Sequence, residues 1–372
     1  MSSGNDAPVH NDLARDVSAD LPTSSMAALG VQYARTPENQ AQSRARYFNS
    51  ANAFNVKLPE VPAGIFSAPV EQARCLPVTA WYACDQSAQL GSPWPATTPF
   101  MLARYARVEP GDTLRAAFLA SGTICYVMQG CISVTLAPAT QTTGRHDARH
   151  ADAGHAHGAH TDAIPRGRPD GVMGTDDVLH GCAGDVMLLP GRVSFTATSD
   201  VPALLWVVTD EPLLAHHGLQ AAPEHANHAP VHFKAEDIAE QIEMIHRTTP
   251  DAGTSGMAVV FASAAQEARR NLMPALTLSL NTLAPHAMQS PHRHNSAALT
   301  LVLAGDTAYS SVDGRRCDWQ SGATLVTPAG APHSHHNEGD TLATFLIVQD
   351  GGLYYEGRTM NFQFLPGDAC RT

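Results

Sequence analysis

The chain has 372 residues, 44% hydrophobic and 16% charged, which is typical of a globular protein long enough for two domains. Its 23 Lys and Arg against 35 Asp and Glu give a formal net charge of -12. This charge argues against nucleic acid or an anionic membrane as a partner, because both attract a basic surface. The sequence contains no long apolar run and begins with no apolar signal segment, so we expect a cytoplasmic protein without a membrane partner.

Cysteine usage indicates a reducing compartment. The seven cysteines are odd in number and form no Cys-x-x-Cys pair, so we expect free thiols and no zinc–thiolate site. Their positions are Cys75, Cys84, Cys125, Cys131, Cys182, Cys317 and Cys370.

In chain order, the first predicted element is a polar N-terminal arm over residues 1–60. From Phe66 onward, short apolar runs alternate with turn residues, and the chain contains 28 Gly and 26 Pro, so strands and turns should predominate. The one clear helical repeat is formed by three isoleucines within 235–247. It predicts a helix that connects two β-rich halves.

The two halves carry the same pattern. Each contains a strand that ends in Gly, then a hairpin, then a strand that runs into Pro. The matching segments are Tyr126–Gly130 and Gly184–Gly191 in the first half, and Leu301–Gly305 and Gly322–Pro328 in the second. This repeat predicts two tandem antiparallel barrels, one over 61–230 and one over 231–372, with few short helices.

A histidine-rich stretch at about 142–180 interrupts the first half. Such tracts can bind Ni, Cu or Zn weakly, but nothing in this one fixes a coordination geometry, so we expect a disordered surface insertion. The histidines in its central part are His146, His150, His155, His157 and His160.

The sharpest chemical signal lies in the second half. His292 and His294 are two positions apart at the entry to an alternating strand, so both side chains face the barrel interior. His333 follows a Pro- and Gly-rich turn and lies on a returning strand. Three neutral imidazoles leave about three of six octahedral positions open. We therefore predict His292, His294 and His333 as ligands of one metal ion, which could be Fe(II), Mn, Ni, Cu or Zn.

These residues resemble the two sequence motifs of the cupin superfamily. The usual glutamate of the first motif is absent, since Ala298 and Leu299 stand in its place. The motif residues present are His292, His294 and Gly305 in the first, and Gly322, Pro328, Gly330, His333 and Asn337 in the second. The resemblance implies an all-β bicupin, that is, two double-stranded β-helix (jelly-roll) barrels.

The stretch from about 230 to 360 resembles the gentisate 1,2-dioxygenase branch of bicupins, through Pro291–Asn295, Asp318–Gly322 and His333–Glu338. That branch holds Fe(II) with three histidines and no glutamate. The resemblance implies an extradiol-type ring-cleaving dioxygenase with one Fe(II) per chain. Its partners would be dioxygen and a hydroxylated or amino-substituted aromatic compound of the gentisate or salicylate kind, and the chain would form a homo-oligomer.

Two features depart from this branch. Sliding the first half onto the second places Ala117, Leu119 and Phe195 where the three ligands stand, so the first barrel is predicted to lack metal ligands. Thr300 occupies the strand where related enzymes often place an arginine for a ring carboxylate. Either the substrate lacks that carboxylate or another cation takes the role, for which the candidates are Arg104, Arg107 and Arg358.

The histidines after His333 are candidate acid–base residues. By strand alternation His335 shares the face of His333, and we predict His335 and His336 as catalytic, with exposed loop histidines as the alternative. Arg293 should point away from the metal and form a salt bridge. Two other functions stay open: a redox-neutral metal-dependent cupin enzyme (lyase, isomerase or decarboxylase) and a non-catalytic small-molecule-binding cupin.

Overall fold

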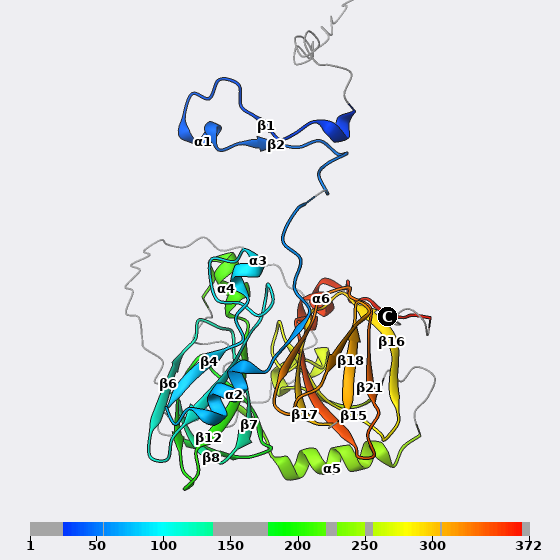
Figure 1. Ribbon diagram of the computed structural model, residues 1–372. Coiled ribbons are helices and arrows are strands. Elements are labelled where there is room, and N and C mark those ends of the chain that lie inside the picture. Colours follow the sequence, from blue (N-terminus) through cyan, green and yellow to red (C-terminus); the bar gives the residue numbers. More distant parts are fainter. Residues whose placement is uncertain are drawn as a thin grey trace, which may run out of the picture. The chain divides into compact units, whose positions relative to one another are not determined.

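The computed structural model describes residues 25–54, 56–136, 178–220, 229–249, 256–305 and 307–366 (Figure 1). The chain divides into two compact units, Met1–Pro59 and Glu60–Thr372. Most of the predicted histidine-rich insertion, including the five histidines named above, lies outside the described residues. Within the described part of the chain, no helix is both long and apolar enough to cross a bilayer.

The first unit is small and exposed. Every described residue in it is exposed or half-buried, so the described part of this unit contains no buried core. Its elements are η2 (Met26–Ala28), β1 (Gln32–Tyr33), α1 (Gln40–Ser43) and β2 (Arg46–Tyr47), with β1 and β2 paired antiparallel.

The second unit contains two barrels, each made of two antiparallel sheets, which confirms the all-β bicupin fold (Figure 1). The larger sheet of the first barrel has the order β13 (Val231–Phe233), β10 (Val186–Leu189), β7 (Thr123–Gln129), β12 (Ala203–Thr209), β5 (Leu102–Val108), β4 (Ala80–Ala83). The smaller sheet has the order β6 (Thr113–Ala117), β11 (Arg192–Ala197), β8 (Cys131–Leu136), β9 (Val178–Cys182).

The second barrel repeats this strand order. Its larger sheet has the order β3 (Gly64–Phe66), β20 (Thr324–Thr327), β17 (Ala298–Ala304), β22 (Ala343–Gln349), β15 (Thr277–Leu283), β14 (Met257–Phe261). Its smaller sheet has the order β16 (Met288–His294), β21 (His333–Asn337), β18 (Ala308–Val312), β19 (Arg315–Asp318), with β23 (Phe362–Phe364) added beside β16.

The barrels exchange edge strands. β3 precedes the first barrel in the chain but pairs with β20 of the second, whereas β13 follows the first barrel and pairs with β10 within it. The sequence predicted one barrel over 61–230 and the other over 231–372, but β3 lies in the first range and pairs in the second barrel, and β13 lies in the second range and pairs in the first. An unpaired sheet edge exposes backbone N–H and C=O groups, and both exchanged strands cover such an edge.

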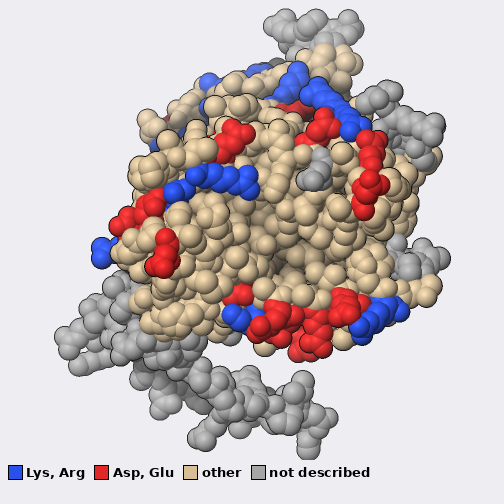
Figure 2. Space-filling model, turned by 60° about the horizontal axis from the view of Figure 1, so that its bottom comes forward, with Lys and Arg blue, Asp and Glu red and all other residues tan. Residues whose placement is uncertain are grey.

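The connecting helix matches its sequence pattern. It is α5 (Ala235–His246), in which Ile238 is buried while its acidic residues are exposed. Figure 2 shows acidic side chains gathered along one edge of the molecule. The remaining helices are short: α2 (Ala68–Cys75), α3 (Ser87–Leu90), α4 (Glu211–His217), η4 (Ala264–Arg269) and α6 (Gly351–Gly357).

Asp185 fastens the start of α5 to the first barrel. Its buried carboxylate accepts hydrogen bonds from the backbone N–H of Ala235 at 2.8 Å, Lys234 Nζ at 3.0 Å and His232 Nε2 at 2.9 Å. A carboxylate removed from water is stable only when its oxygens are paired in this way.

The outer faces of the two larger sheets pack against each other and form one hydrophobic core from both barrels. Trp206 Nε1 on β12 donates to Thr324 Oγ1 on β20 at 2.9 Å, and the Tyr105 hydroxyl donates to the carbonyl of Gly322 at 2.6 Å. The first barrel therefore buries the outer wall of the second.

One cysteine prediction is wrong. Cys131 on β8 and Cys182 on β9 lie directly opposite each other, with their Cα atoms 4.1 Å apart, and form a disulfide. Among the described cysteines, those left free are Cys75, Cys84, Cys125 and Cys317. Disulfides are rare in reducing compartments, so this pair counts against the predicted cytoplasmic location, which stays a prediction.

Asp210, which follows β12, should make the stability of the fold depend on pH. Its carboxylate accepts hydrogen bonds from the backbone N–H of Ser121 at 2.8 Å and from the Ser121 hydroxyl, but burial dominates and raises its pKa to about 6. The carboxyl group of Asp210 therefore stays protonated in the folded chain up to about pH 6, whereas it loses its proton near pH 4 in the unfolded chain. As the pH rises from about 4 to 6, the unfolding free energy falls, because the unfolded chain releases this proton and the folded chain does not.

We expect Asp210→Asn, which is neutral at every pH, to remove this dependence. Relative to the wild type, the variant should gain roughly 2–3 kcal/mol of unfolding free energy between pH 4 and pH 7, measured by urea unfolding. A difference between the two proteins that stays constant over this range would contradict the assignment.

Candidate metal centre

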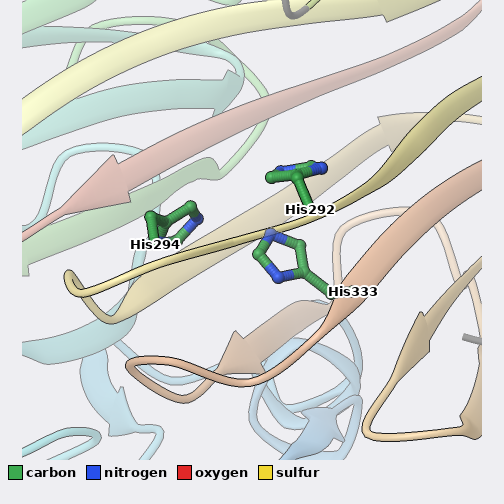
Figure 3. Close-up of side chains that lie close together, drawn as sticks. All are labelled: His292, His294 and His333. Atoms are coloured by element: carbon green, nitrogen blue, oxygen red, sulfur yellow. The ribbon is translucent and has the colours of Figure 1, made fainter. Parts of the chain in front are cut away.

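Three histidines converge inside the second barrel (Figure 3). His292 and His294 lie on β16, and His333 lies directly opposite His292 on the neighbouring strand β21. All three side chains are buried, and their candidate ligand atoms lie within 4.8 Å of one another. Among the described residues, this is the one group of His, Cys, Asp and Glu side chains close enough to share a metal ion.

Each of these imidazoles is oriented by a backbone carbonyl two residues away. Nδ1 of His292 donates to the carbonyl of Ser290 at 2.8 Å, and Nδ1 of His294 donates to that of Ser296 at 2.7 Å. His333 Nδ1 makes the same bond to Ala331 at 2.8 Å. A carbonyl can only accept, so each Nδ1 carries the proton and each Nε2 presents a lone pair. This donor set fits a divalent transition metal.

Burial keeps the three rings neutral. It lowers the pKa of His292, lowers that of His294 to about 4, and lowers that of His333 well below the usual value. A metal must otherwise compete with protons for imidazole nitrogen, so rings that are neutral at physiological pH are ready to coordinate.

The turn before His333 explains the cupin pattern of Pro and Gly. Gly330 has φ +77°, a backbone conformation that other residues adopt only with strain. In this conformation its N–H donates to the carbonyl of His294 at 2.7 Å. The turn therefore ties the start of β21 to the strand that carries the other two ligands.

The interior of the first barrel is filled by apolar side chains. Phe195, the predicted counterpart of His333, is fully buried in this core. Leu119, the predicted counterpart of His294, is 55% exposed instead of facing inward. One reason is a bulge in β16 between Gln289 and His292, which shifts the register of the ligand strand and breaks a residue-for-residue match.

His335 shares the inward face of β21 with His333, as the alternation predicts, and lines the same cavity. Its Nδ1 lies 2.7 Å from Ser310 Oγ, which accepts a hydrogen bond from Trp319 Nε1 at 2.8 Å. Indole N–H can only donate, so the hydroxyl keeps its own proton for His335 Nδ1. This favours the tautomer with a proton on Nε2. Burial lowers the pKa of His335 to about 3, so this ring stays neutral.

His336 lies on the opposite face of β21. Its ring stacks on Tyr309 with centroids 4.4 Å apart, and its Nε2 lies 2.8 Å from Ser334 Oγ. It does not line the cavity. The structure therefore separates the two predicted acid–base residues, and only His335 is placed to meet a ligand. Arg293 is exposed and donates to Gln363 Oε1 at 2.8 Å, and it forms no salt bridge with any residue that the structure describes.

The three candidate ligands and His335 line a cavity of about 630 Å³. Its lining contains no aspartate or glutamate among the described residues, and its two arginines are Arg269 and Arg270 at the end of η4. Arg269 Nε is paired with Glu356 of α6 at 2.7 Å. Arg270 has no ion-pair partner in the described part of the chain. A bound metal would therefore be an uncompensated positive charge in this cavity, and the solvent-exposed Arg270 would be an unpaired cation in its lining.

The three arginines proposed from the sequence do not line this cavity. Arg104 is paired with Glu211, and Arg107 with Glu109, both within the first barrel. Arg358 follows α6 and lies 3.4 Å from Glu356. The sequence did not indicate Arg270, because it follows η4 outside the motif segments and no periodicity relates it to the three histidines.

Gln349 is a further cavity residue that sequence reasoning missed. Its Nε2 lies 3.3 Å from His294 Nε2, the nitrogen available for a metal. A lone pair serves either a hydrogen bond or a metal, so Gln349 would release His294 on metal binding. Its only sequence signal is its position at the end of an apolar strand.

The cupin domain family matches residues 279–349, which contain all three histidines. A gentisate 1,2-dioxygenase of Ralstonia sp. is 33% identical over 81 residues, covering 22% of this chain and 23% of that protein. A 1-hydroxy-2-naphthoate 1,2-dioxygenase of Nocardioides sp. (strain KP7) is 38% identical over 63 residues, covering 17% of this chain and 16% of that protein. The chain thus spans only about a quarter or less of the length of these curated relatives.

The fold match extends much further. The structure of a salicylate 1,2-dioxygenase from Pseudaminobacter salicylatoxidans covers 83% of this chain and 90% of its own, with a TM-score of 0.61 and 12% sequence identity. At that identity the match concerns the fold, and it includes both barrels.

His294→Ala should abolish metal binding while the fold survives, because the other two imidazoles cannot enclose the ion. We expect metal content, measured by elemental analysis after iron loading, to fall from about one ion per chain to near zero, with little change in circular dichroism. His336→Ala is the matched control and should retain the metal. Equal metal content in the wild type and His294→Ala would contradict the ligand assignment.

Proposed function

We propose that this chain, a bicupin whose second barrel resembles the gentisate 1,2-dioxygenase branch, is an Fe(II)-dependent dioxygenase. Its substrate would be a hydroxylated or amino-substituted aromatic acid of the gentisate or salicylate kind. The similar proteins support a dioxygenase at the level of the family, and they do not support the extradiol type of ring cleavage expected from the sequence.

One observation carries the proposal: a neutral three-imidazole ligand set in a cavity whose described lining residues include no acidic side chain. Three neutral ligands leave the full charge of a divalent ion uncompensated in a poorly solvated site, where an unpaired charge is costly. A substrate that supplies a carboxylate and a neighbouring hydroxyl or amino donor would balance that charge. Such a ligand would occupy two adjacent open positions.

Bound Fe(II) would supply a redox-active centre at which an electron-rich ring and dioxygen react. The protein would hold both reactants next to each other in an enclosed barrel. His292, His294 and His333 would hold the metal through Nε2. His335 would donate a hydrogen bond from Nε2 to a substrate oxygen, as the Trp319–Ser310 relay favours that tautomer.

Arg270 would pair with the substrate carboxylate. Among the described residues that line the cavity, Arg270 is the arginine without an ion-pair partner. It would take the role of the arginine that related enzymes often carry on the strand after the first two histidines. Arg269 would serve a different purpose, because its bond to Glu356 ties η4 to α6 at the cavity. We also propose that the chain assembles as a homo-oligomer in the cytoplasm, where the Cys131–Cys182 disulfide would be an exception to the usual absence of disulfides.

The test is oxygen consumption by the purified, iron-loaded protein with gentisate, salicylate and 1-hydroxy-2-naphthoate. We expect one equivalent of oxygen to be consumed per ring, together with loss of the aromatic absorbance. Product formation without oxygen uptake would instead favour a redox-neutral cupin enzyme. Ligand binding without turnover would favour a binding protein.

Arg270→Gln should weaken carboxylate recognition. The loss of a charge-assisted pair worth about 1.5–3 kcal/mol should raise KM for the acid substrate by roughly 10- to 100-fold. Arg358→Gln is the matched control, since Arg358 also ends a helix with positive φ but does not line the cavity. Equal KM values for Arg270→Gln and the wild type would contradict this role.

A further inference from the structure

Two threonines form a polar patch on the inner wall of the metal-binding barrel. Thr300 lies on β17 and Thr327 on the neighbouring strand β20, and both line the cavity. Thr327 is opposite Ala298 and Thr300 is opposite Leu325, so the two threonines are diagonal neighbours on one face of the sheet. Each is only 1% exposed.

Both hydroxyls lack a hydrogen-bond partner. Neither Thr300 Oγ1 nor Thr327 Oγ1 is bonded to any residue in the described part of the chain. A buried polar group without a partner lowers the stability of the fold, so folded proteins rarely retain two of them side by side. A function that uses the hydroxyls would explain the cost.

Thr324 lies on the same strand as Thr327, but its hydroxyl is hydrogen-bonded within the protein. Its side chain faces the first barrel, where Oγ1 accepts from Trp206 Nε1 at 2.9 Å and lies 2.6 Å from the Tyr105 hydroxyl. Strand β20 therefore carries one threonine that is satisfied by protein and another, Thr327, that faces the cavity unsatisfied.

The patch lies within reach of a ligand held at the metal centre. Gln349, whose Nε2 is 3.3 Å from His294 Nε2, is opposite Ala298, which is in turn opposite Thr327. These three residues form a row across three strands. Adjacent strands are about 4.8 Å apart, so Thr327 lies about 10 Å across the sheet from Gln349. One substituted aromatic ring, with a bond at each end, spans such a gap.

We infer that Thr300 and Thr327 form a subsite that hydrogen-bonds a hydroxyl or amino substituent on the far side of the ring from its metal-binding donors. The inference rests on the proposed function, because it takes an aromatic ring as the ligand. Two hydroxyls can together donate to and accept from such a substituent. A ring with hydrogen at that position leaves both unsatisfied, and sites of this kind discriminate strongly against the analogue lacking the group.

The experiment compares two ligands that differ by one ring hydroxyl. Gentisate carries a hydroxyl opposite the one beside its carboxylate, and salicylate carries hydrogen there. Binding of each to the iron-loaded protein is measured without oxygen by titration calorimetry, for the wild type, Thr300→Val and Thr327→Val. We expect the wild type to bind gentisate at least tenfold more tightly. Each valine variant should reduce that preference several-fold and leave salicylate binding nearly unchanged.

Stability provides a second readout that a structural role would not reproduce. Valine matches threonine in shape, so Thr300→Val and Thr327→Val should leave the unfolding midpoint unchanged or raise it. Thr324→Val is the matched control on the same strand. It should lower the midpoint, because Trp206 and Tyr105 would lose a buried partner.

Three results would overturn the subsite: no preference for gentisate in the wild type, the same preference in both valine variants, or destabilisation of those variants as large as that of Thr324→Val. The oxygen electrode separates this failure from that of the proposed function. Oxygen consumption with an unchanged preference in the variants would overturn only the subsite. A preference that depends on the threonines, without oxygen consumption, would overturn only the dioxygenase assignment.

Discussion

Three hydrogen bonds from imidazole Nδ1 to backbone carbonyls are the constraint on which the candidate metal centre depends. They fix each proton on Nδ1, so Nε2 of His292, His294 and His333 is the nitrogen left free to bind a shared metal ion. Burial then keeps the rings neutral. Without these bonds, rotation or a change of tautomer would turn a donor away from the ion.

The two barrels share one strand order but differ in what fills them. The interior of the first is packed with apolar side chains, whereas the second opens into a cavity lined by histidines. The exchanged strands and the shared core make the first barrel an extended support for the second. This arrangement gives a reason to retain a second barrel: it buries the outer wall of the sheet that carries Thr300 and Gln349, and so holds the cavity wall in place.

The charges and hydrogen-bonding groups that line the cavity indicate what kind of ligand it would bind. Neutral metal ligands and Arg270 call for negative charge, and the absence of acidic side chains among the described lining residues leaves the ligand to supply it. The hydroxyls of Thr300 and Thr327, on the larger sheet of this barrel, have no hydrogen-bond partner among the described residues. A ligand with a further hydrogen-bonding group could pair with them. An aromatic acid with more than one ring substituent meets both requirements in a single molecule.

Local sequence patterns determined much of this protein. The repeated strand, hairpin and Pro-ending strand predicted two barrels, and the isoleucine spacing predicted α5 almost to the residue. Alternation placed His292, His294, His333 and His335 on one face. These features follow from period 2 and period 3.6, which act over a few residues and can therefore be read directly from the chain.

The features that join distant parts of the chain were decided by the order of the strands in each sheet and by the closing of the sheets into barrels. The exchange of β3 and β13, the Cys131–Cys182 disulfide and the position of Arg270 in the cavity all join segments that are distant in the sequence. The unsatisfied state of Thr300 and Thr327 likewise depends on which side chains meet inside the closed barrel. Periodicity tells which face a side chain takes, but only the tertiary structure decides what lies opposite that face, because the pairing of strands is set by contacts across the whole chain.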